Sequence, residues 1–171
     1  MNLERHIFLI GFMGVGKTTT SECLSRKLQV EELDTDGMIV EKEGRSIADI
    51  FAEEGEPYFR QAETDLLDEL AERQPCIISC GGGMAMREEN VARMKQSGTV
   101  VFLTAAPETI YERVKDCDDR PLLNGNMNIP YIQGLMEARE PKYRGAADIV
   151  TATDGLSPEQ VAEQIILSLQ A

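Results

Sequence analysis

The residues best suited to chemistry stand near the start of the chain, in the stretch G-F-M-G-V-G-K-T at positions 11–18. This stretch fits the pattern G-x-x-x-x-G-K-[ST], and an apolar run before it and a helical pattern after it supply the strand and helix that such a loop requires. Glycines let backbone N–H groups approach phosphate oxygens beside the positive end of a helix. Lys17 is then expected to reach the β- and γ-phosphates, and the Thr18 hydroxyl to bind Mg²⁺. The loop predicts binding of a nucleoside triphosphate, but it leaves the acceptor of the phosphate undecided.

Two acidic residues, Asp34 and Asp36, follow the next short apolar segment, in the stretch E-L-D-T-D. Phosphoryl transfer on a loop of this kind usually involves an acid at the end of a neighbouring strand, which helps to hold Mg²⁺. Residues two positions apart share one face of an extended segment, where one acid could serve the metal and the other an acceptor hydroxyl. The alternative is that both are exposed acids in a turn.

Four arginines and a run of glycines are further candidates. Taken singly, each arginine is more typical of an exposed surface than of a site; they are Arg60, Arg113, Arg120 and Arg139. An arginine on a long loop can nevertheless close over a triphosphate and stabilise charge in the transition state. Gly81–Gly83 is more than a turn needs, and it would let a ligand approach bare backbone.

The composition describes an acidic protein with few groups for other kinds of chemistry. The 171 residues are 42% hydrophobic, and the formal net charge is −13. With 17 basic residues and no basic stripe, the chain is not expected to bind nucleic acid, and no apolar run is long enough to predict a membrane span. The four cysteines form no C-x-x-C pair and there is one histidine, so no zinc site is expected. Because the N-terminal segment has the pattern of a strand and not of a signal peptide, we expect free thiols in the cytoplasm.

Hydrophobic periodicity places these residues on alternating strands and helices, the pattern of an α/β protein with a parallel sheet. Strands are predicted over residues 6–10, 32–36, 75–80, 99–105 and 148–152. Helices are expected over about 17–28, 37–44, 46–55, 56–74, 88–97, 107–115 and 129–140, and from 157 onward. The polar residues 116–128 break this pattern, and so long a loop in a compact domain is usually functional or disordered. Together, these strands and helices predict a three-layer α/β/α sandwich with about five parallel strands.

Taken together, these segments resemble one family. In this order and spacing, the chain contains G-F-M-G-V-G-K-T-T, L-D-T-D, I-F-A-E-E-G-E-P-Y-F-R-Q-A-E, C-G-G-G, R-P-L-L and E-A-R-E-P-K-Y, a set that resembles shikimate kinase over essentially the whole chain. The resemblance implies a fold like that of nucleoside-monophosphate kinases, and ATP-dependent phosphorylation of the 3-hydroxyl of shikimate on the route to chorismate and the aromatic amino acids. It also implies one domain over residues 1–171, with the P-loop at 11–18, the shikimate-binding region at about 34–63 and a mobile lid at about 113–126.

The resemblance assigns residues to the ATP side of the site. Arg113 matches a position that flanks the adenine, and Arg120 belongs to the lid that closes over ATP. Thr18 and Asp34 would bind Mg²⁺, the latter through water. The other ATP contacts implied are those of the loop residues Gly14, Val15, Gly16, Lys17 and Thr19.

On the acceptor side, the resemblance implies that Asp36 binds the shikimate hydroxyls as the candidate base and that Gly82 offers its backbone to a hydroxyl. Arg60 and Arg139 would take the carboxylate, which a planar guanidinium matches with two hydrogen bonds. The resemblance also implies that Glu63 orients Arg60 and that Phe51 and Phe59 line the shikimate pocket. The expected catalytic residues are Lys17, Asp36 and Arg120.

The sequence departs from the family's pattern at two places. Many members have an arginine near the adenine in the last strand-to-helix connection, whereas residues 151–160 here are T-A-T-D-G-L-S-P-E-Q, so the adenine contact is left unassigned. The residue before the triple glycine is often Thr and here is Cys80, whose thiol near the site could be sensitive to oxidation.

Two other functions fit part of the pattern. A kinase of another small hydroxy acid, such as gluconate, would keep the architecture, but Arg60, Arg139 and the glycine run argue against it. A non-catalytic nucleotide-binding module typically lacks the loop lysine or the Mg²⁺ acid, and both are present here. We therefore expect a cytoplasmic, monomeric enzyme with ATP and shikimate as substrates, Mg²⁺ as cofactor, and no nucleic-acid or membrane partner.

Overall fold

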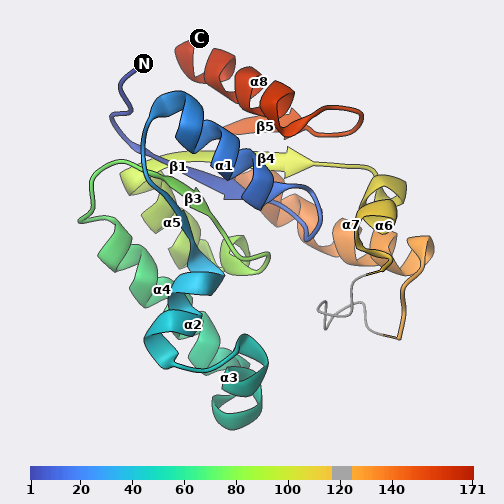
Figure 1. Cartoon of the computed structure of the whole chain (residues 1–171). Helices are drawn as coiled ribbons and strands as arrows, with labels where there is room; N and C mark the ends of the chain where they lie inside the picture. Colours follow the sequence, from blue (N-terminus) through green and yellow to red (C-terminus); the bar gives the residue numbers. More distant parts are fainter. Residues whose placement is uncertain (117–124) are drawn as a thin grey trace.

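The computed structural model describes residues 1–116 and 125–171, and a parallel β-sheet lies at its centre (Figure 1). Within the described residues the sheet has five strands in the order β2-β3-β1-β4-β5. The strands are β1 (His6–Ile10), β2 (Glu32–Asp34), β3 (Ile77–Ser79), β4 (Gly98–Thr104) and β5 (Ile149–Ala152). Every pairing between neighbours is parallel, which confirms the predicted fold class.

Helices connect the strands and cover both faces of the sheet (Figure 1). They are α1 (Lys17–Leu28), α2 (Thr35–Glu43), α3 (Ile47–Glu54), α4 (Glu56–Leu70), the short 3-10 helix η1 (Met84–Met86), α5 (Glu88–Ser97), α6 (Pro107–Val114), α7 (Ile129–Ala146) and α8 (Pro158–Gln170). Proline is the first residue of α6 and of α8, where its missing N–H costs no hydrogen bond.

Strand β1 holds the middle of the sheet, and all of its residues are buried. Ile7 pairs with Ile77 of β3 on one side and with Thr99 of β4 on the other. The chain leaves β1 toward β2 and later passes from β3 to β4, so the direction of winding reverses between β1 and β3. In open parallel sheets, ligands bind beyond the carboxyl ends of the strands at such a reversal. The phosphate-binding stretch, which follows β1, is therefore at the expected place.

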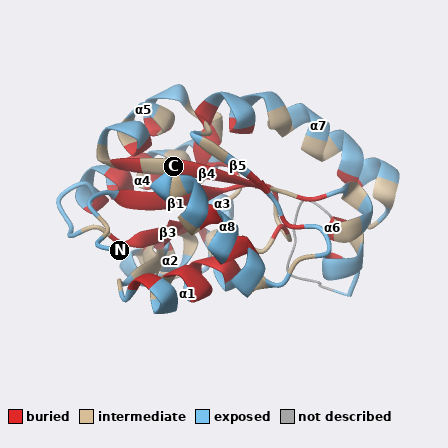
Figure 2. Cartoon of the chain, turned by 90° about the horizontal axis from the view of Figure 1, so that it is seen from above, coloured by how far each residue is buried: buried red, intermediate tan, exposed pale blue. Residues whose placement is uncertain are grey.

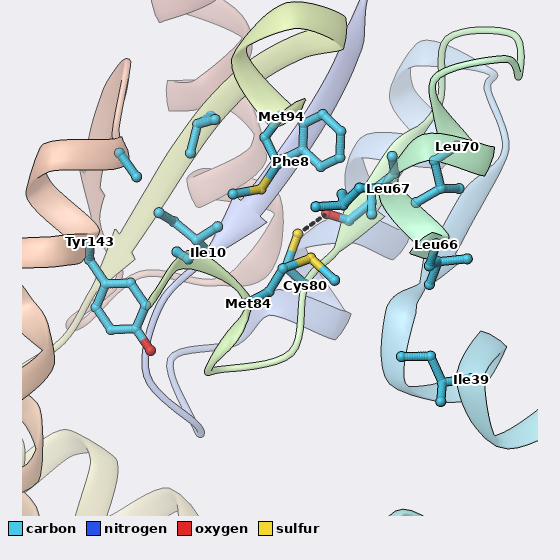
Figure 3. Close-up of a cluster of buried hydrophobic side chains, with 14 of the residues drawn as sticks. Phe8, Ile10, Ile39, Leu66, Leu67, Leu70, Cys80, Met84, Met94 and Tyr143 are labelled. Carbon is cyan, nitrogen blue, oxygen red and sulfur yellow. Dashed lines mark hydrogen bonds between the residues drawn. The ribbon is translucent and has the colours of Figure 1, made fainter. Parts of the chain in front are cut away.

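The apolar side chains of β1 alternate between two cores, one on each face of the sheet. Ile7 and Leu9 pack with residues of α1 and α8, whereas Phe8 and Ile10 pack with residues of α4 and α5. This alternation is the period of two that a strand imposes. Figure 2 shows the buried sheet between exposed helical surfaces, and Figure 3 shows the second core, with Phe8 and Ile10 among its members.

Several elements differ from their predicted bounds. Helix α4 ends at Leu70 and not at residue 74, and β3 is limited to Ile77–Ser79. Strand β2 ends at Asp34, and the chain is already helical from Thr35. Helix α7 continues past residue 140 to Ala146 and contains Pro141. Tyr143 and Ala146, in its last turns, are buried in the second core, and this burial outweighs the hydrogen bond that the proline cannot donate.

The predicted lid is described only at its two ends. Residues 117–124, which include Arg120, lie outside the described part of the chain. Before them α6 ends at Val114, and after them Asn128 caps α7 by accepting a hydrogen bond from the backbone N–H of Tyr131. Among the helices of the described residues, none is long and apolar enough to cross a membrane.

Candidate active site

A cleft of about 1180 Å³ opens beyond the carboxyl ends of β1, β2 and β3. This volume exceeds the usual range for a pocket that holds one small ligand, so there is room for two. Arg120 is not among the described residues. All the other site residues predicted from the sequence line this cleft: Gly14, Val15, Gly16, Lys17, Thr18, Thr19, Asp34, Asp36, Phe51, Phe59, Arg60, Glu63, Gly82, Arg113 and Arg139.

The loop between β1 and α1 has the backbone that its glycines permit. Gly11, Gly14 and Gly16 have positive φ angles of 148°, 83° and 99°, which other residues rarely adopt. A Cβ on Gly11 would lie 2.6 Å from the carbonyl oxygen of Leu103 in β4, so packing against the sheet also requires glycine there. Gly16 is the N-cap of α1 and has no side chain to cover the first N–H groups of the helix. The positive end of α1 is therefore available to an anion.

Two cations lie against this loop. Lys17 Nζ donates a hydrogen bond to the carbonyl oxygen of Gly11 at 2.6 Å. Arg113 Nη1, from α6, donates to the carbonyl oxygen of Gly14 at 3.0 Å and to Thr153 Oγ1 at 3.3 Å. Backbone carbonyls of the loop thus hold two positively charged side chains beside the N-terminus of α1. Their charge favours the binding of phosphate there.

The end of the cleft near β5 has apolar side chains beside Arg113 and Thr153, in the connection where the sequence left the adenine contact unassigned. Asp154 fixes this connection to α6, because its Oδ1 accepts hydrogen bonds from Ala106 N at 2.9 Å and Thr109 Oγ1 at 2.6 Å. The hydrogen bond from Thr109 is the main reason that the pKa of Asp154 lies below its usual value. The apolar side chains that line the cleft here, and are candidates to contact a base, are those of Leu156, Pro158 and Val161.

Asp34 and Asp36 both line the cleft, but they do not share one extended segment. Asp34 ends β2, whereas Asp36 lies in the first turn of α2, so the predicted geometry of two acids on one face of a strand is wrong. The bend is held by Thr35, whose Oγ1 accepts a hydrogen bond from Gly81 N at 2.9 Å. A Cβ on Gly81 would lie 2.5 Å from Asp36 Oδ1, so this glycine makes room for the carboxylate.

The glycine segment 81–83 has a role that sequence reasoning did not find. We expected bare backbone for a ligand to approach, and in the structure each of these glycines also faces a charged side chain of the cleft. Besides Asp36 at Gly81, Arg139 Nη1 lies 3.0 Å from where a Cβ of Gly82 would be, and the guanidinium of Arg60 would overlap a Cβ of Gly83. The segment therefore lets charged groups from three helices converge on three consecutive residues.

Arg60 is oriented by acids of its own helix. Its Nη1 donates to Glu63 Oε1 at 2.8 Å, and its Nε donates to Glu56 Oε1 at 3.2 Å. Glu63 is fully buried, and this burial raises its pKa to about 7 despite the opposing effect of Arg60. Phe51 and Phe59 pack edge to face on the wall of the same cleft, with 5.1 Å between their ring centroids.

Tyr143 on α7 holds the glycine segment from the other side. Its hydroxyl donates a hydrogen bond to the carbonyl oxygen of Gly82 at 2.5 Å. Burial of the ring raises the pKa of the phenol, and the neighbouring Arg139 opposes this effect only in part. The sequence contains Tyr143 in the stretch R-E-P-K-Y, but our reasoning gave it no role. Its spacing of four residues from Arg139, which places both on one face of a helix, was the available signal.

Comparisons with known proteins bear directly on this cleft. The family model described as shikimate kinase matches residues 13–170. The chain belongs to the shikimate kinase family. A shikimate kinase of Dehalococcoides mccartyi is 41% identical over 99% of this chain and 96% of the relative. One of Aquifex aeolicus is also 41% identical, over 96% of this chain and 95% of the relative.

Solved structures of shikimate kinases have the same fold. The structure of shikimate kinase from Acinetobacter baumannii in complex with shikimate has a TM-score of 0.90 at 34% identity and covers 97% of this chain and 93% of that chain. The Aquifex aeolicus structure has a TM-score of 0.83 at 41% identity, with 96% of each chain covered. A gluconokinase from Sinorhizobium meliloti, at 12% identity and a TM-score of 0.59 over 99% of this chain and 94% of that chain, shares the fold alone.

In this member of the shikimate kinase family, the cysteine before the triple glycine is shielded. Cys80 is 1% exposed, and burial raises the pKa of its thiol far above the usual value. Cys80 also lines the cleft, as expected for a thiol near the site. Because the thiolate is the reactive form, burial and a raised pKa oppose the expected oxidation, which stays a prediction. Figure 3 shows Cys80 among the side chains of the second core.

Proposed function

We propose that this chain transfers the γ-phosphoryl group of ATP to the 3-hydroxyl of shikimate, which gives shikimate 3-phosphate and ADP for the biosynthesis of chorismate and the aromatic amino acids. The observation that carries the proposal is the convergence of a phosphate-binding loop, an acid and two arginines on one cleft. Shikimate is a small carboxylic acid with three hydroxyl groups. Two guanidinium groups suit its carboxylate, and a carboxylate side chain can select one hydroxyl among three.

On the donor side, we assign the triphosphate to the loop and the first turn of α1. Lys17 neutralises charge on the transferred group, since phosphoryl transfer depends mainly on positioning and on charge stabilisation. Arg113 contributes to the ATP side, beside Gly14. Closure of Arg120 over ATP stays a prediction from the sequence, because that residue lies outside the described part of the chain. The remaining loop contacts assigned to ATP are Gly14, Val15, Gly16, Thr18 and Thr19.

On the acceptor side, we assign the carboxylate of shikimate to Arg60 and Arg139, whose guanidinium groups lie at neighbouring positions of the glycine segment. Asp36 fixes the reacting hydroxyl and accepts its proton late in the transfer. Three supporting roles remain. We assign a backbone contact with a hydroxyl to Gly82 and the orientation of Arg60 to Glu63. Phe51 and Phe59 form the apolar wall of the pocket.

An ATP-dependent kinase generally uses a divalent metal ion, and we assign Mg²⁺ to Thr18 and Asp34. Both residues line the cleft next to the phosphate-binding loop, and hydroxyl and carboxylate oxygens are the ligands that Mg²⁺ prefers. When bound, the ion neutralises charge on the β- and γ-phosphates. We expect activity to be lost on chelation with EDTA and to return when Mg²⁺ is added in excess.

The test of the proposed function is release of ADP from Mg-ATP by the purified protein, with and without shikimate. We expect release to depend on shikimate and to be slow when gluconate replaces it. Release of ADP that shikimate does not accelerate, in a protein that is folded and binds ATP, would overturn the proposal. Faster release with gluconate than with shikimate would assign the cleft to another hydroxy acid.

We further propose that the chain acts as one domain and as a monomer, in the cytoplasm, without a nucleic-acid or membrane partner. In support of the last point, the net charge of −13 opposes binding to nucleic acid. Sedimentation equilibrium should give the mass of one chain. A mass of two chains would contradict the proposed monomer.

A further inference from the structure

A series of buried hydrogen bonds lies behind the acceptor side of the cleft. Thr64 Oγ1, on α4, donates to Asn90 Oδ1 on α5 at 2.6 Å, and Asn90 Nδ2 donates to the carbonyl oxygen of Met84 at 3.0 Å. Arg87 Nη1 donates to Thr64 Oγ1 at 3.0 Å. The carbonyl oxygen of Arg60 also lies 3.2 Å from Thr64 Oγ1, but the hydroxyl has one proton and the bond to Asn90 is shorter. Thr64 and Asn90 are 1% and 0% exposed, so each depends on these partners.

This network joins the two segments that carry the acceptor groups. Thr64 lies one helical turn beyond Arg60 on α4. Met84 opens η1 directly after the glycine segment, and its N–H donates to the carbonyl oxygen of Gly81 at 3.1 Å. Asn90 therefore ties the helix of Arg60 to the glycine segment through two hydrogen bonds. These partners belong to α4, to η1, and to α5 with its N-cap Arg87, whereas the loop after β1, α1 and α6 build the ATP side.

The charged ends of three side chains pack closely against the glycine segment. The guanidinium of Arg60 lies where a Cβ of Gly83 would be, and Asp36 Oδ1 lies 2.5 Å from the Cβ position of Gly81. Arg139 Nη1 lies 3.0 Å from the Cβ position of Gly82. A small shift of α4 along the glycine segment would therefore move Arg60 relative to both other charged groups. Binding groups must be held to within about half an ångström, which requires support from behind.

We propose that the Thr64–Asn90 pair is a positioning device for the acceptor side. It fixes Arg60 relative to Gly81–Gly83, and in this way it sets the affinity for the carboxylate of the acceptor without contacting it. The inference rests on the proposed function, since it takes Arg60 as a ligand of that carboxylate. It predicts that loss of the pair weakens binding of shikimate and leaves binding of ATP intact.

Two substitutions at one position separate the hydroxyl from the shape of the side chain. Thr64→Val removes the hydroxyl and keeps the shape, so Asn90 loses a buried partner. We expect the shikimate KM to rise about tenfold and the ATP KM to stay within about twofold. Thr64→Ser keeps the hydroxyl and should restore the shikimate KM to within about threefold of the wild type. KM is the informative quantity, because an unfolded fraction lowers the maximal rate and leaves the KM of the folded enzyme unchanged.

Arg93→Gln is the matched control. Arg93, on α5, also bonds to α4, through its Nε and Asp68 Oδ1 at 2.8 Å. This bridge lies on the exposed surface, about two turns of α4 beyond Arg60. It joins the same two helices away from the glycine segment, so both KM values should stay as in the wild type.

The outcomes distinguish this inference from the proposed function. If the wild type is active and Thr64→Val only lowers the melting temperature, or raises both KM values equally, the pair has a general structural role and the inference is overturned. If the wild type itself shows no shikimate-dependent release of ADP, the proposed function is overturned and the inference with it. Should Thr64→Val not fold, Asn90→Leu removes the same bond from α5 together with the bond to Met84, and the same difference between the two KM values is expected.

Discussion

Glu63 and Cys80 are two buried titratable groups in the lining of the cleft, and their neighbours affect their pKa values differently. Burial raises the pKa of both side chains. Arg60 Nη1 lies 2.8 Å from Glu63 Oε1 and opposes this effect, so the pKa of Glu63 is about 7. Burial outweighs the influence of Lys17 on Cys80, which therefore stays a neutral thiol. Burial thus disfavours the reactive thiolate of Cys80, whereas Glu63 titrates near neutral pH while it orients Arg60.

Glu63→Gln should change how stability depends on pH. Glu63 binds its proton more tightly in the folded state, with a pKa of about 7, than in the unfolded chain, where 4.5 applies. Titration of Glu63 therefore lowers the stability of the folded state as pH rises from about 4.5 to 7. The loss is at most on the order of 3 kcal/mol, and it stays constant at higher pH. The glutamine variant lacks this term, so its free energy of unfolding should fall less between pH 5 and 8. Urea unfolding at both pH values measures it.

The control for this experiment is Glu163→Gln. Glu163 is exposed and pairs with Lys27 at 3.2 Å, so its substitution should leave the pH dependence as in the wild type. An identical loss of stability from pH 5 to 8 in the wild type and Glu63→Gln would contradict a raised pKa for Glu63.

Lys17→Met should lower kcat by about 10²–10³-fold, because a positive charge on the transferred phosphoryl group is lost. Lys27→Met is the matched control, since Lys27 lies on the same helix, away from the loop, and pairs with an exposed acid. Circular dichroism should show that both variants fold, and the coupled ADP assay measures kcat. A Lys17→Met variant that turns over at a near-normal rate would refute the role of that lysine.

At the scale of elements, individual helices and strands could be predicted from local sequence patterns, but the contacts between them could not. Hydrophobic periodicity predicted α5 and α8 closely, because that signal lies within each segment. The start of α2 at Thr35 was missed, because it depends on Gly81 N, which comes from another segment of the chain. The tight approach of charged groups to residues 81–83 likewise depends on three separate helices. Glycines in the sequence indicate that space is needed, but not what fills it.

Gly81→Ala should raise the shikimate KM by about tenfold or more. The added Cβ would lie 2.5 Å from Asp36 Oδ1, so the carboxylate must move from its place at the acceptor side. The matched change is Gly145→Ala on α7, where a Cβ meets nothing within 4 Å. That variant should keep both KM values and gain about 0.5–1 kcal/mol of stability, because alanine favours a helix over glycine. Kinetics and urea unfolding of the two variants test this, and an unaltered KM in Gly81→Ala would contradict the close contact.

For the whole molecule, the donor side of the cleft could be predicted from the residues alone, and the acceptor side could not. Residues 11–18 are contiguous, so their spacing already specifies a loop for phosphate. Arg60 and Arg139 come from α4 and α7, and an arginine that lines a cleft has the same local sequence signals as one on the surface. Only the resemblance to a family connected them. The Thr64–Asn90 pair gave no signal at all, because two polar residues on different helices are ordinary until the fold buries them together.

Binding of each substrate should stabilise the folded protein independently, because the two sides of the cleft are built from different elements. At about 100 times its Kd, shikimate should add about 2.7 kcal/mol, which for a chain of this length raises Tm by roughly 5–10 °C. Arg139→Ala should lose most of the shift with shikimate and keep the shift with ATP, since Arg139 lies against Gly82 and is assigned to the carboxylate of shikimate. Lys142→Ala, an exposed position on the same helix, should keep both shifts. If Arg139→Ala lost both shifts equally, its side chain would support the whole cleft and not the carboxylate alone.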